Sequence, residues 1–372
     1  MNTRKSQIAS IIIMSVLLFG LAAYSWLKPQ DDFSYSERRH LSKRPELSAE
    51  SLMAGGENSF MKQFEDYAAD QFPFREAYRT LYSVTSLYGL AEKEINGIYL
   101  KNGHAVKIEY PLNQESVDWA LERFSEIQAK YLQKSRTYIC IIPDKNYFLA
   151  DTSGHPALDY DSLFSTMREG TKEYAAWIDL TGQLEIGDYY DTDTHWRQEN
   201  LKETASYLCG QMGAEAYAEY ETVTTNIPFY GVYYGQAALP LAPDVLSYLT
   251  NQIMEELQIF CLDSGKPEEI PLYDMEKAAG KDAYEMFLGG SRSLITLENP
   301  NAETDRELVV FRDSFASSLA PLLTSGYHKV TLVDIRYIST SVLGNYVEFE
   351  DADVLFLYST TLLNSAKSQL MK

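Results

Sequence analysis

The sequence predicts an α/β fold: a three-layer α/β/α domain on a parallel central sheet, with an inserted cap region and one N-terminal transmembrane helix. After residue 110, short continuous apolar runs alternate with segments of helical periodicity, which is typical of a parallel sheet covered by helices. The chain has 372 residues, 45% of them hydrophobic, and is long enough to enclose a large core. An uncharged stretch at residues 8–27 predicts the membrane helix.

That stretch, IASIIIMSVLLFGLAAYSWL, has the length that spans a bilayer as a helix. Arg4 and Lys5 precede it, and Asp31 and Asp32 follow it. The positive-inside rule therefore predicts a cytosolic N-terminus, with the bulk of the chain outside the membrane. A cleaved signal peptide is the alternative, although LAAYSW is a poor small-residue cleavage site. We expect a single-pass protein of the cell membrane.

Three segments are expected along the chain: a cytosolic stub and signal-anchor at residues 1–30, a juxtamembrane linker with a helical segment at 31–92, and the main domain at 93–372. The helical segment covers residues 57–90 and is interrupted by Pro73. Residues 215–290 are irregular and rich in Tyr, Pro and Gly. We expect an insertion or cap there, with one amphipathic helix near residues 243–258.

The elements of the main domain follow from periodicity and turn signals. A hairpin is expected at 95–110, where Asn102 and Gly103 form the turn, and a helix follows Asn113. The remaining elements, in chain order, are a strand at 137–143, a helix at 171–180, a strand at 185–191, a helix at 197–213 and strands at 307–311, 329–335 and 353–358.

Charge and cysteine content exclude several classes of function. The net charge of −21 argues against nucleic-acid binding, which needs a basic surface. Three cysteines cannot all pair, and their spacing fits neither a disulfide framework nor a zinc site, so buried free thiols are expected. No cofactor is expected.

Ser314 is the first candidate site residue. In FRDSFASSLAPLL a predicted buried strand ends at Phe311, a polar turn of Asp313 and Ser314 follows, and a helix begins. Active sites of α/β sheets gather at the carboxyl ends of strands, where free backbone N–H groups can hold an oxyanion. The alternative is that Asp313 or Ser314 only caps the helix.

Asp193 and His195, in YYDTDTHWRQENL, are the second candidates. Residues two apart in an extended segment point to the same side, so the carboxylate can reach the near ring nitrogen and leave the far one facing outward. A serine nucleophile needs such a base and orienting acid. Two alternatives remain: Asp193 or Thr194 caps the following helix, or Asp191, Asp193 and His195 bind a metal ion. No second metal-binding segment supports the metal site.

Five further residues stand where they could contribute to the site. Lys145 follows the strand at 137–143 and is either a site cation or an exposed loop charge. Arg336 and Tyr337 end the strand at 329–335 and could reach the same edge of the sheet. Gly289 and Gly290 either allow close backbone approach or form an ordinary turn.

Several segments together resemble the DHHW family, whose relatives include the alginate O-acetylation proteins AlgX and AlgJ, with SGNH-hydrolase-like catalytic domains. They occur in the family's order across roughly residues 33–360. The matching segments are FSYSERRHLSKRPELS, DQFPFR, INGIYL, IPDK, DTHW, FLGGS, RDSF and VDIRY.

The resemblance implies a triad of Asp193, His195 and Ser314, in that chain order. The sequence departs from the family pattern at three positions: Thr194 replaces the first His of the family name, Arg312 replaces the Gly before Asp-Ser, and Ser291 replaces an expected Asn. The oxyanion donors are therefore left open. Candidates are backbone amides near Ser314 and in the turn of Gly289 and Gly290, or the side chains of Arg336 and Tyr337.

The resemblance also implies the activity: an extracytoplasmic, serine-dependent O-acetyltransferase or acetylesterase acting on a cell-surface or secreted polysaccharide. Trp196 and nearby tyrosines (Tyr230, Tyr233, Tyr234) could stack on sugar rings. By family analogy, a multispanning membrane acyltransferase of the MBOAT class would supply acetyl groups. A non-catalytic polysaccharide-binding or assembly protein on the same fold is the main alternative, and a metal-dependent hydrolase is the third.

Overall fold

The structure, a computed structural model, describes residues 3–216 and 219–370. Met1 and Asn2 of the predicted cytosolic stub, residues 217–218 of the expected insertion and residues 371–372 at the end of the main domain lie outside the described residues. The chain divides into two compact units. One runs to Asn96 and includes Tyr234–Pro240, and the other comprises Gly97–Tyr233 and Leu241 onward.

The first unit begins with α1 (Thr3–Leu27), which is long and apolar enough to cross a membrane, by length and composition. The polar segment after it contains a short antiparallel hairpin of β1 (Phe33–Ser34) and β2 (Arg39–His40). The helical turns that follow are α2 (Ala49–Met53), η1 (Gly56–Asn58), α3 (Phe60–Asp70), α4 (Arg75–Val84) and η2 (Thr85–Gly89). Pro73 separates α3 from α4, as the sequence predicts.

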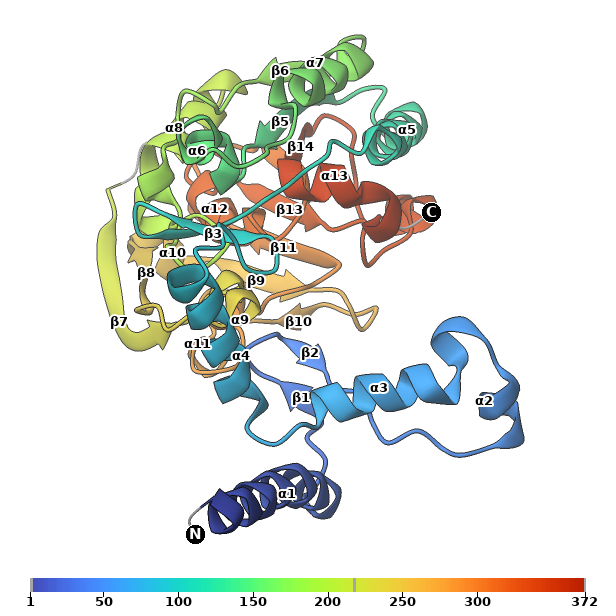
Figure 1. The fold of residues 1–372 in the computed structure, drawn as a ribbon. Coiled ribbons are helices and arrows are strands. Elements are labelled where there is room, and N and C mark those ends of the chain that lie inside the picture. Colours follow the sequence, from blue (N-terminus) through green and yellow to red (C-terminus); the bar gives the residue numbers. More distant parts are fainter. Residues whose placement is uncertain (1–2, 217–218, 371–372) are drawn as a thin grey trace. The chain divides into compact units, whose positions relative to one another are not determined.

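The second unit is built on an eight-stranded sheet in the order β10-β9-β11-β13-β12-β14-β5-β6 (Figure 1). The strands are β5 (Arg136–Ile142), β6 (Ala176–Ile178), β9 (Gln258–Cys261), β10 (Glu268–Glu269), β11 (Leu294–Glu298), β12 (Glu307–Arg312), β13 (Lys329–Val333) and β14 (Asp353–Ser359). The five strands from β13 to β6 are parallel, whereas β11, β9 and β10 pair antiparallel at the other edge. The sheet is therefore mixed rather than wholly parallel.

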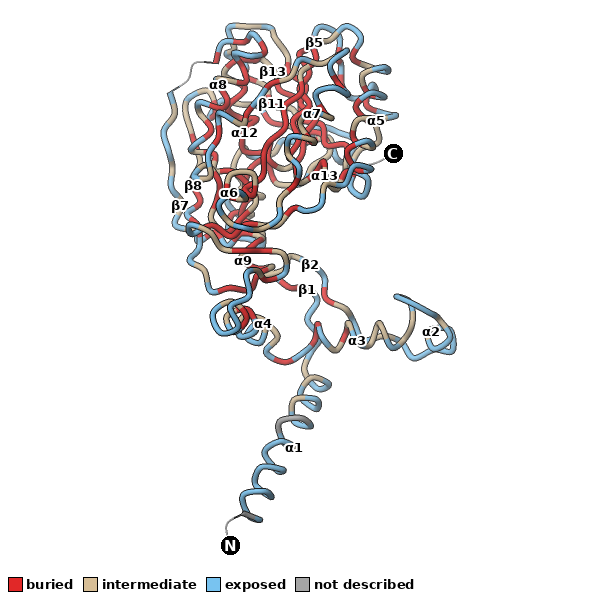
Figure 2. Tube along the Cα trace, turned by 45° about the horizontal axis from the view of Figure 1, so that its top comes forward, coloured by how far each residue is buried: buried red, intermediate tan, exposed pale blue. Residues whose placement is uncertain are grey.

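Helices cover both faces of the sheet and give it three layers. Alternate residues of each central strand enter different cores: Val310 of β12 packs with α8 (Lys202–Gln211) and α12 (Ala316–Leu323). Phe311 packs on the opposite face with helices α5 (Gln114–Tyr131), α7 (Tyr160–Thr171) and α13 (Thr360–Gln369). Buried residues accordingly gather in the sheet and on the inner sides of these helices (Figure 2). This burial on two faces explains the continuous apolar runs that predicted the strands.

The smaller elements of this unit surround the sheet. The hairpin of β3 (Ile98–Lys101) and β4 (His104–Lys107) forms where Asn102 and Gly103 predict it. The others are α6 (Lys145–Ser153), η3 (Ile186–Asp188), η4 (Gln198–Asn200), β7 (Glu221–Phe229), β8 (Asp244–Thr250), α10 (Gln252–Glu256), α11 (Met275–Ala278), η5 (Ala283–Met286) and η6 (Thr340–Asn345); α9 (Val232–Ala237) is shared between the units.

Three of the predicted elements are wrong. Residues 171–180 contain the edge strand β6 instead of a helix, because α7 ends at Thr171. Residues 185–191 form a single 3₁₀ turn and a loop instead of a strand. The amphipathic helix expected at 243–258 is mostly strand β8, followed by the short α10. The expected insertion at 215–290 also supplies β9 and β10 to the main sheet, so it is not only a cap.

Candidate active site

Ser314 lies at the carboxyl end of β12, two residues before α12 begins. The turn that carries it is fixed by the buried Asp313 carboxylate, whose Oδ1 accepts the Phe315 N–H at 3.0 Å. The Oδ2 of Asp313 accepts the Ser359 N–H at 2.8 Å, which ties the end of β12 to the end of the neighbouring β14. Asp313 therefore caps the turn, and Ser314 is left with its hydroxyl at the edge of the sheet.

The structure brings Asp193, His195 and Ser314 into one hydrogen-bonded chain. His195 Nε2 lies 2.8 Å from Ser314 Oγ, and His195 Nδ1 lies 2.6 Å from Asp193 Oδ1. The Asp193 carboxylate is fully buried and also accepts the N–H of His195 at 3.0 Å and of Val232 at 2.8 Å. A carboxylate at Nδ1 favours the tautomer with the proton on that nitrogen, which leaves Nε2 free to accept the serine proton.

The loop that carries Asp193 is held from one side by the ammonium group of Lys145. Lys145 is 2% exposed, and its Nζ donates to the carbonyl oxygens of Ala105, Tyr190, Asp191 and Asp193 at 2.6 to 3.1 Å. Burial lowers the pKa of Lys145 to about 7, while the neighbouring carboxylates oppose that shift. Lys145 therefore supports the backbone of the loop; the exposed loop charge expected as one alternative is wrong.

The amide side of the same loop is held by the buried carboxylate of Asp244. Its oxygens accept the N–H of Asp191 at 2.7 Å and the N–H and hydroxyl of Thr192 at 2.8 and 2.6 Å. Arg197, after the loop, pairs with the same carboxylate at 2.5 Å. The loop therefore lies between a buried cation and a buried anion, which explains how a segment without regular secondary structure can hold Asp193 in place.

Gly231 allows the chain to pass directly over Asp193. A Cβ atom at this glycine would lie 2.4 Å from the Cα of Asp193, a distance that no side chain tolerates. This close approach lets the next residue, Val232, donate its N–H to the carboxylate.

The imidazole of His195 is held between two aromatic rings. Tyr284 stacks on it with centroids 3.8 Å apart and an interplanar angle of 8°, and Phe315 lies 4.9 Å away at a tilt. The Tyr284 hydroxyl shares a hydrogen bond of 2.8 Å with Ser318 Oγ in α12, and burial raises the pKa of Tyr284. The ring is therefore fixed beside the histidine rather than mobile.

Trp196 is fully buried and does not face solvent. Its Nε1 donates to the Phe315 carbonyl at 3.0 Å and to Ser318 Oγ at 2.9 Å. The expectation that Trp196 stacks on a sugar ring is therefore wrong: it joins the histidine loop to the helix that follows Ser314. Gln198 strengthens the same junction by donating to the Ser318 carbonyl at 2.7 Å.

The remaining predicted residues have partners or surroundings other than Ser314. Arg336 forms a two-pronged ion pair with Asp334, at 2.8 and 2.6 Å, which engages its guanidinium. Tyr337 is half exposed and lines a small cavity beyond the end of β13. Gly289 and Gly290 have φ of 70° and 85° and form a turn in which the Gly289 carbonyl accepts from Lys277.

Arg312, at the position of the family's glycine, is fully buried beneath the serine turn. Its guanidinium donates to Ser317 Oγ at 3.0 Å and to the Asp313 carbonyl at 3.3 Å. Asp334 Oδ2 lies 4.0 Å from it, and burial lowers its pKa. The substitution therefore places a supporting cation behind the turn, where it stabilises the carbonyl side of Asp313.

Asp191, which suggested a metal site, points away from His195. Its Oδ1 lies 3.1 Å from Nδ1 of His104 and 3.8 Å from Arg197. Within residues 3–216 and 219–370, no group of three or more His, Cys, Asp or Glu side chains is arranged to hold a metal ion.

Sequence reasoning missed Asp244, Gly231 and Tyr284. All three lie in residues 215–290, where irregular composition gave no periodicity from which to place them. A single acid, glycine or tyrosine carries no motif of its own. Only the tertiary structure shows that they contact the loop of Asp193 and His195.

Comparison with known proteins supports the fold. No protein-family profile matches the sequence, and no curated protein matches it. A DHHW family protein from Eubacterium siraeum has a similar structure, with a TM-score of 0.56 and 18% identity over 75% of this chain and 97% of that one. Bacillus cereus PatB1, solved with a sulfonyl adduct, gives a TM-score of 0.57 at 18% identity over 72% of this chain and 95% of that one.

A weaker likeness is to the O-acetyltransferase domain of Pseudomonas putida AlgJ, with a TM-score of 0.42 at 13% identity over 72% of this chain and 92% of that one. Among the proteins with a TM-score above 0.5 is the DHHW family protein, in agreement with the family that the sequence motifs resemble.

Proposed function

We propose that this chain is a membrane-anchored, serine-dependent O-acetyltransferase or acetylesterase with an SGNH-hydrolase-like domain, acting on a polysaccharide outside the membrane. The observation that carries the proposal is the path of short hydrogen bonds from Asp193 through His195 to Ser314, at 2.6 and 2.8 Å. A nucleophile, a base and an orienting acid in this order are the parts that acyl transfer needs.

In the first half-reaction, Ser314 Oγ attacks the carbonyl carbon of an acetyl ester while His195 Nε2 takes the hydroxyl proton. The tetrahedral intermediate collapses, the carbon–oxygen bond to the leaving alcohol breaks, and Nε2 returns the proton to that oxygen. The acetyl group is then an ester on Ser314. Asp193 keeps the proton on Nδ1 and stabilises the charged imidazole, an effect worth about 10⁴ in rate in serine proteases.

In the second half-reaction, a sugar hydroxyl or a water gives its proton to His195 Nε2 and attacks the acetyl carbonyl. The bond from the carbonyl carbon to Ser314 Oγ breaks, and Nε2 reprotonates the serine. A sugar acceptor makes the enzyme a transferase, and water makes it an esterase. The same residues serve both reactions, so the acceptor that reaches the site decides the outcome.

The backbone N–H of Ser314 is the donor that we propose for the oxyanion. Across the described part of the chain it donates to no acceptor, whereas the N–H of Phe315 is taken by Asp313 and that of Ala316 by the Asp313 carbonyl. An N–H that precedes a helix and lies beside the nucleophile is suited to a developing negative charge.

The sequence motifs, a structural relative and helix α1 support the proposed substrate class and the proposed location of the enzyme. The ordered motifs resemble a family associated with polysaccharide O-acetylation, which favours an acetyl group and a carbohydrate. The similarly folded PatB1 was solved with a sulfonyl adduct, so we expect Ser314 to react with sulfonylating reagents. The apolar α1 supports anchoring in the cell membrane with the main domain outside, where an MBOAT-class acyltransferase could supply acetyl groups.

The test is hydrolysis of p-nitrophenyl acetate and acetyl transfer to oligosaccharides by the full chain and by Ser314→Ala. We expect Ser314→Ala to lose at least about 10³-fold in kcat/KM, because it removes the nucleophile. Ser325→Ala, just beyond the C-terminal end of α12, is the matched control and should keep full activity. If the wild type binds polysaccharide but shows no serine-dependent turnover, the chain is a binding or assembly protein instead.

A further inference from the structure

Helix α4 presents large apolar side chains outward and both of its arginines inward, unlike an ordinary surface helix. The outward face starts at its N-cap and consists of four residues that are 47% to 67% exposed: Phe74, Tyr78, Leu81 and Tyr82. Figure 2 shows the exposed character of this helix. Large contiguous apolar surfaces of this kind mark interaction sites, because water does not stabilise them.

The inward face of α4 carries the cations, and they are already paired. The side chains of Arg75 and Arg79 are only 15% and 16% exposed; Arg75 pairs with Glu37 at 2.5 Å and Arg79 donates to the Gly235 carbonyl at 2.8 Å. Ser83 is buried and donates to the Ala237 carbonyl at 2.6 Å. The helix is therefore fixed in this orientation by its polar side, and the outward apolar face cannot turn in.

The outward face is continuous with the end of α1. Tyr24 of α1 stacks on Phe74 with centroids 6.1 Å apart and an interplanar angle of 8°. The Asp31 N–H donates to Gln71 Oε1, and Gln71 Nε2 donates to the Asp31 carbonyl, both at 2.9 Å, which ties the segment after α1 to the end of α3. Phe74 itself has a φ of 58°, a strained conformation for a bulky residue that projects its ring outward.

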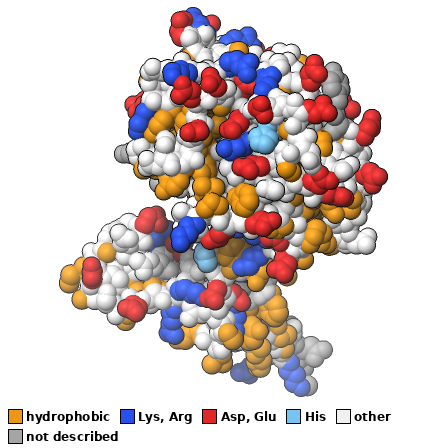
Figure 3. Space-filling view, turned by 180° about the vertical axis from the view of Figure 1, so that it is seen from behind, with side chains coloured by type: hydrophobic (Ala, Val, Ile, Leu, Met, Phe, Trp, Pro, Cys, Tyr) orange, Lys and Arg blue, Asp and Glu red, His pale blue; other side chains and the backbone are white. Residues whose placement is uncertain are grey.

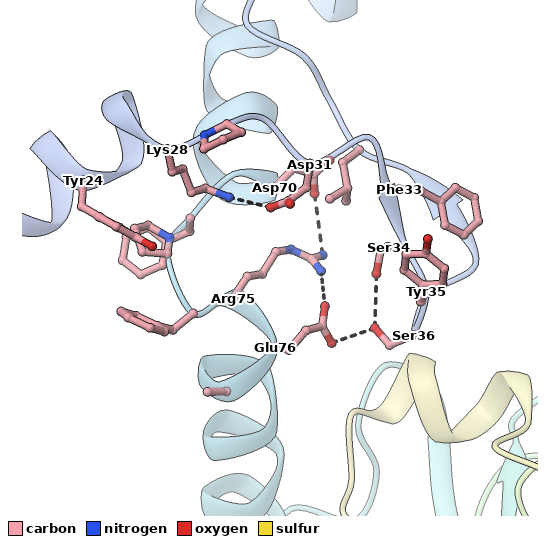
Figure 4. A pocket seen from close by; sticks show the side chains of 16 residues that line it. Tyr24, Lys28, Asp31, Phe33, Ser34, Tyr35, Ser36, Asp70, Arg75 and Glu76 are labelled. Carbon is pink, nitrogen blue, oxygen red and sulfur yellow. Dashed lines mark hydrogen bonds and ion pairs between the residues drawn. The ribbon is translucent and has the colours of Figure 1, made fainter. Parts of the chain in front are cut away.

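A cavity of about 690 Å³ lies beside this junction. In Figure 4, Tyr24 and Lys28 enter it from α1 and the residue after it, and Arg75 and Glu76 enter from α4. Its charges are paired, as between Lys28 and Asp31 at 2.6 Å, and five of the residues that line it are aromatic: Tyr24, Phe33, Tyr35, Phe72 and Phe74. Aromatic rings mixed with paired charges are characteristic of the layer where lipid headgroups meet acyl chains.

The position of α1 indicates what contacts the outward face of α4. α1 exposes large hydrophobic side chains such as Ile11, Val16 and Phe19, and hydrophobic side chains gather near the N-terminus in Figure 3. If α1 crosses the bilayer, its last turn, with Tyr24 and Trp26, lies in the interfacial layer, where such residues are enriched. Phe74, stacked on Tyr24, then lies in the same layer.

We infer that the outward face of α4, beginning at Phe74, rests in the interfacial layer of a phospholipid bilayer beside α1, with lipid headgroups filling the adjoining cavity. This inference rests on the proposed anchoring by α1. The outward face of α4 is apolar, and the arginines of the helix point inward. Attachment of α4 to the bilayer therefore depends on apolar burial rather than on anionic lipid. If so, α4 and the segments packed on it lie against the membrane surface, and the residues after α1 do not act as a flexible linker.

The test uses the full chain in phosphatidylcholine nanodiscs that contain lipids brominated near the top of the acyl chains, which quench nearby tryptophan. Phe74→Trp and Tyr78→Trp are made in a Trp26→Phe background, so that the only other tryptophans belong to the second unit. Leu52→Trp, an exposed position on α2 of the same unit, is the matched control. The chain with its native Trp26 reports separately on α1.

We expect bromolipid to quench Trp26 and both α4 variants, and to leave Leu52→Trp unchanged, with the same quenching when part of the lipid is replaced by phosphatidylglycerol. If Trp26 is quenched but Phe74→Trp and Tyr78→Trp match the control, the inference is overturned while the proposed anchoring by α1 stands. If Trp26 is not quenched, the proposed anchoring by α1 and the inference about α4 both fail. Quenching of the α4 variants only with phosphatidylglycerol contradicts the apolar origin of the contact.

Discussion

At the residue scale, the candidate site depends on groups that fix one carboxylate. Asp193 is fully buried, yet it accepts three N–H donors: its own loop's backbone, the histidine ring and the backbone of Val232. A buried carboxylate without such partners would be costly, so these donors are what allow it to remain charged beside His195.

Gly231→Ala tests this packing most directly. The added methyl group would lie 2.4 Å from Asp193, so the loop must move and carry the carboxylate away from His195. We expect a loss of about 10²-fold in kcat/KM, as for a displacement of about 1 Å at a reacting group, with destabilisation of about 1–3 kcal/mol. Ester hydrolysis and thermal unfolding measure the two effects.

The control is Gly182→Ala, because a methyl group there meets no atom within 4 Å. It should leave both activity and stability nearly unchanged. Equal activity of the two variants would show that the close approach of Gly231 does not position Asp193.

Tyr284 is a positioning residue through its stack on His195. Tyr284→Leu removes the ring, and we expect kcat to fall by about threefold to tenfold with little change in KM, since an aromatic pair contributes about 0.5–1.5 kcal/mol. Tyr284→Phe keeps the ring and should retain most of the activity. A loss in Tyr284→Phe as large as in Tyr284→Leu would assign the role to the hydroxyl instead.

At the scale of elements, irregular segments hold the site more than helices and strands do. Only Ser314 stands at the end of a strand; Asp193 and His195 lie in a loop between η3 and η4. That loop is rigid because Lys145 binds its carbonyl groups and Asp244 binds its amides. Trp196 then joins it to Phe315 and to Ser318 of α12, so hydrogen bonds connect the histidine and serine segments directly.

In the first unit, the pairing of Asp70 on α3 with Arg39 on β2 predicts a dependence on pH. The hydrogen bond from Arg39 holds the pKa of Asp70 at about 2, below its ordinary value of 3.8. A depressed carboxyl pKa contributes stability above the unfolded value, and that stability is lost as pH falls through the folded value. Pepsin should therefore cleave the segment around β2 increasingly between about pH 4 and pH 2.

Asp70→Asn should be cleaved there throughout this range, because the charge that binds Arg39 is absent. Asp66→Asn changes an exposed carboxylate on the same helix and is the control; it should follow the wild type. Identical cleavage of all three chains at every pH would exclude a role for the pair in ordering the segment.

The strands of the sheet core were predictable because burial on two faces leaves an unmistakable apolar run. The strand and turn around Ser314 were predictable for the same reason. Residues 185–191 were not, since EIGDYYD has the composition of a short strand, but its tyrosines are buried in the cores beside the loop rather than by a sheet partner. At residues 171–180, pairing with β5 overrides the local helical preference.

At the scale of the whole molecule, the chain order is Asp193, His195 and Ser314, and the base His195 stands 119 residues before the serine to which it bonds. Periodicity predicts strands and helices, but it cannot show that two distant segments meet in the fold. In the sequence, only the motifs that resemble a known family linked Asp193 and His195 with Ser314. The supporting residues between them carry no such motif and therefore emerge only from the fold.

The central claim is that Ser314 forms an acetyl-enzyme. The direct measurement is mass spectrometry of the full chain, quenched in acid during turnover of p-nitrophenyl acetate and digested to peptides. We predict an acetyl group on the peptide that contains Ser314, absent from Ser314→Ala and strongly reduced in His195→Ala. Acetylation at another residue, or undiminished turnover by Ser314→Ala, would contradict the account.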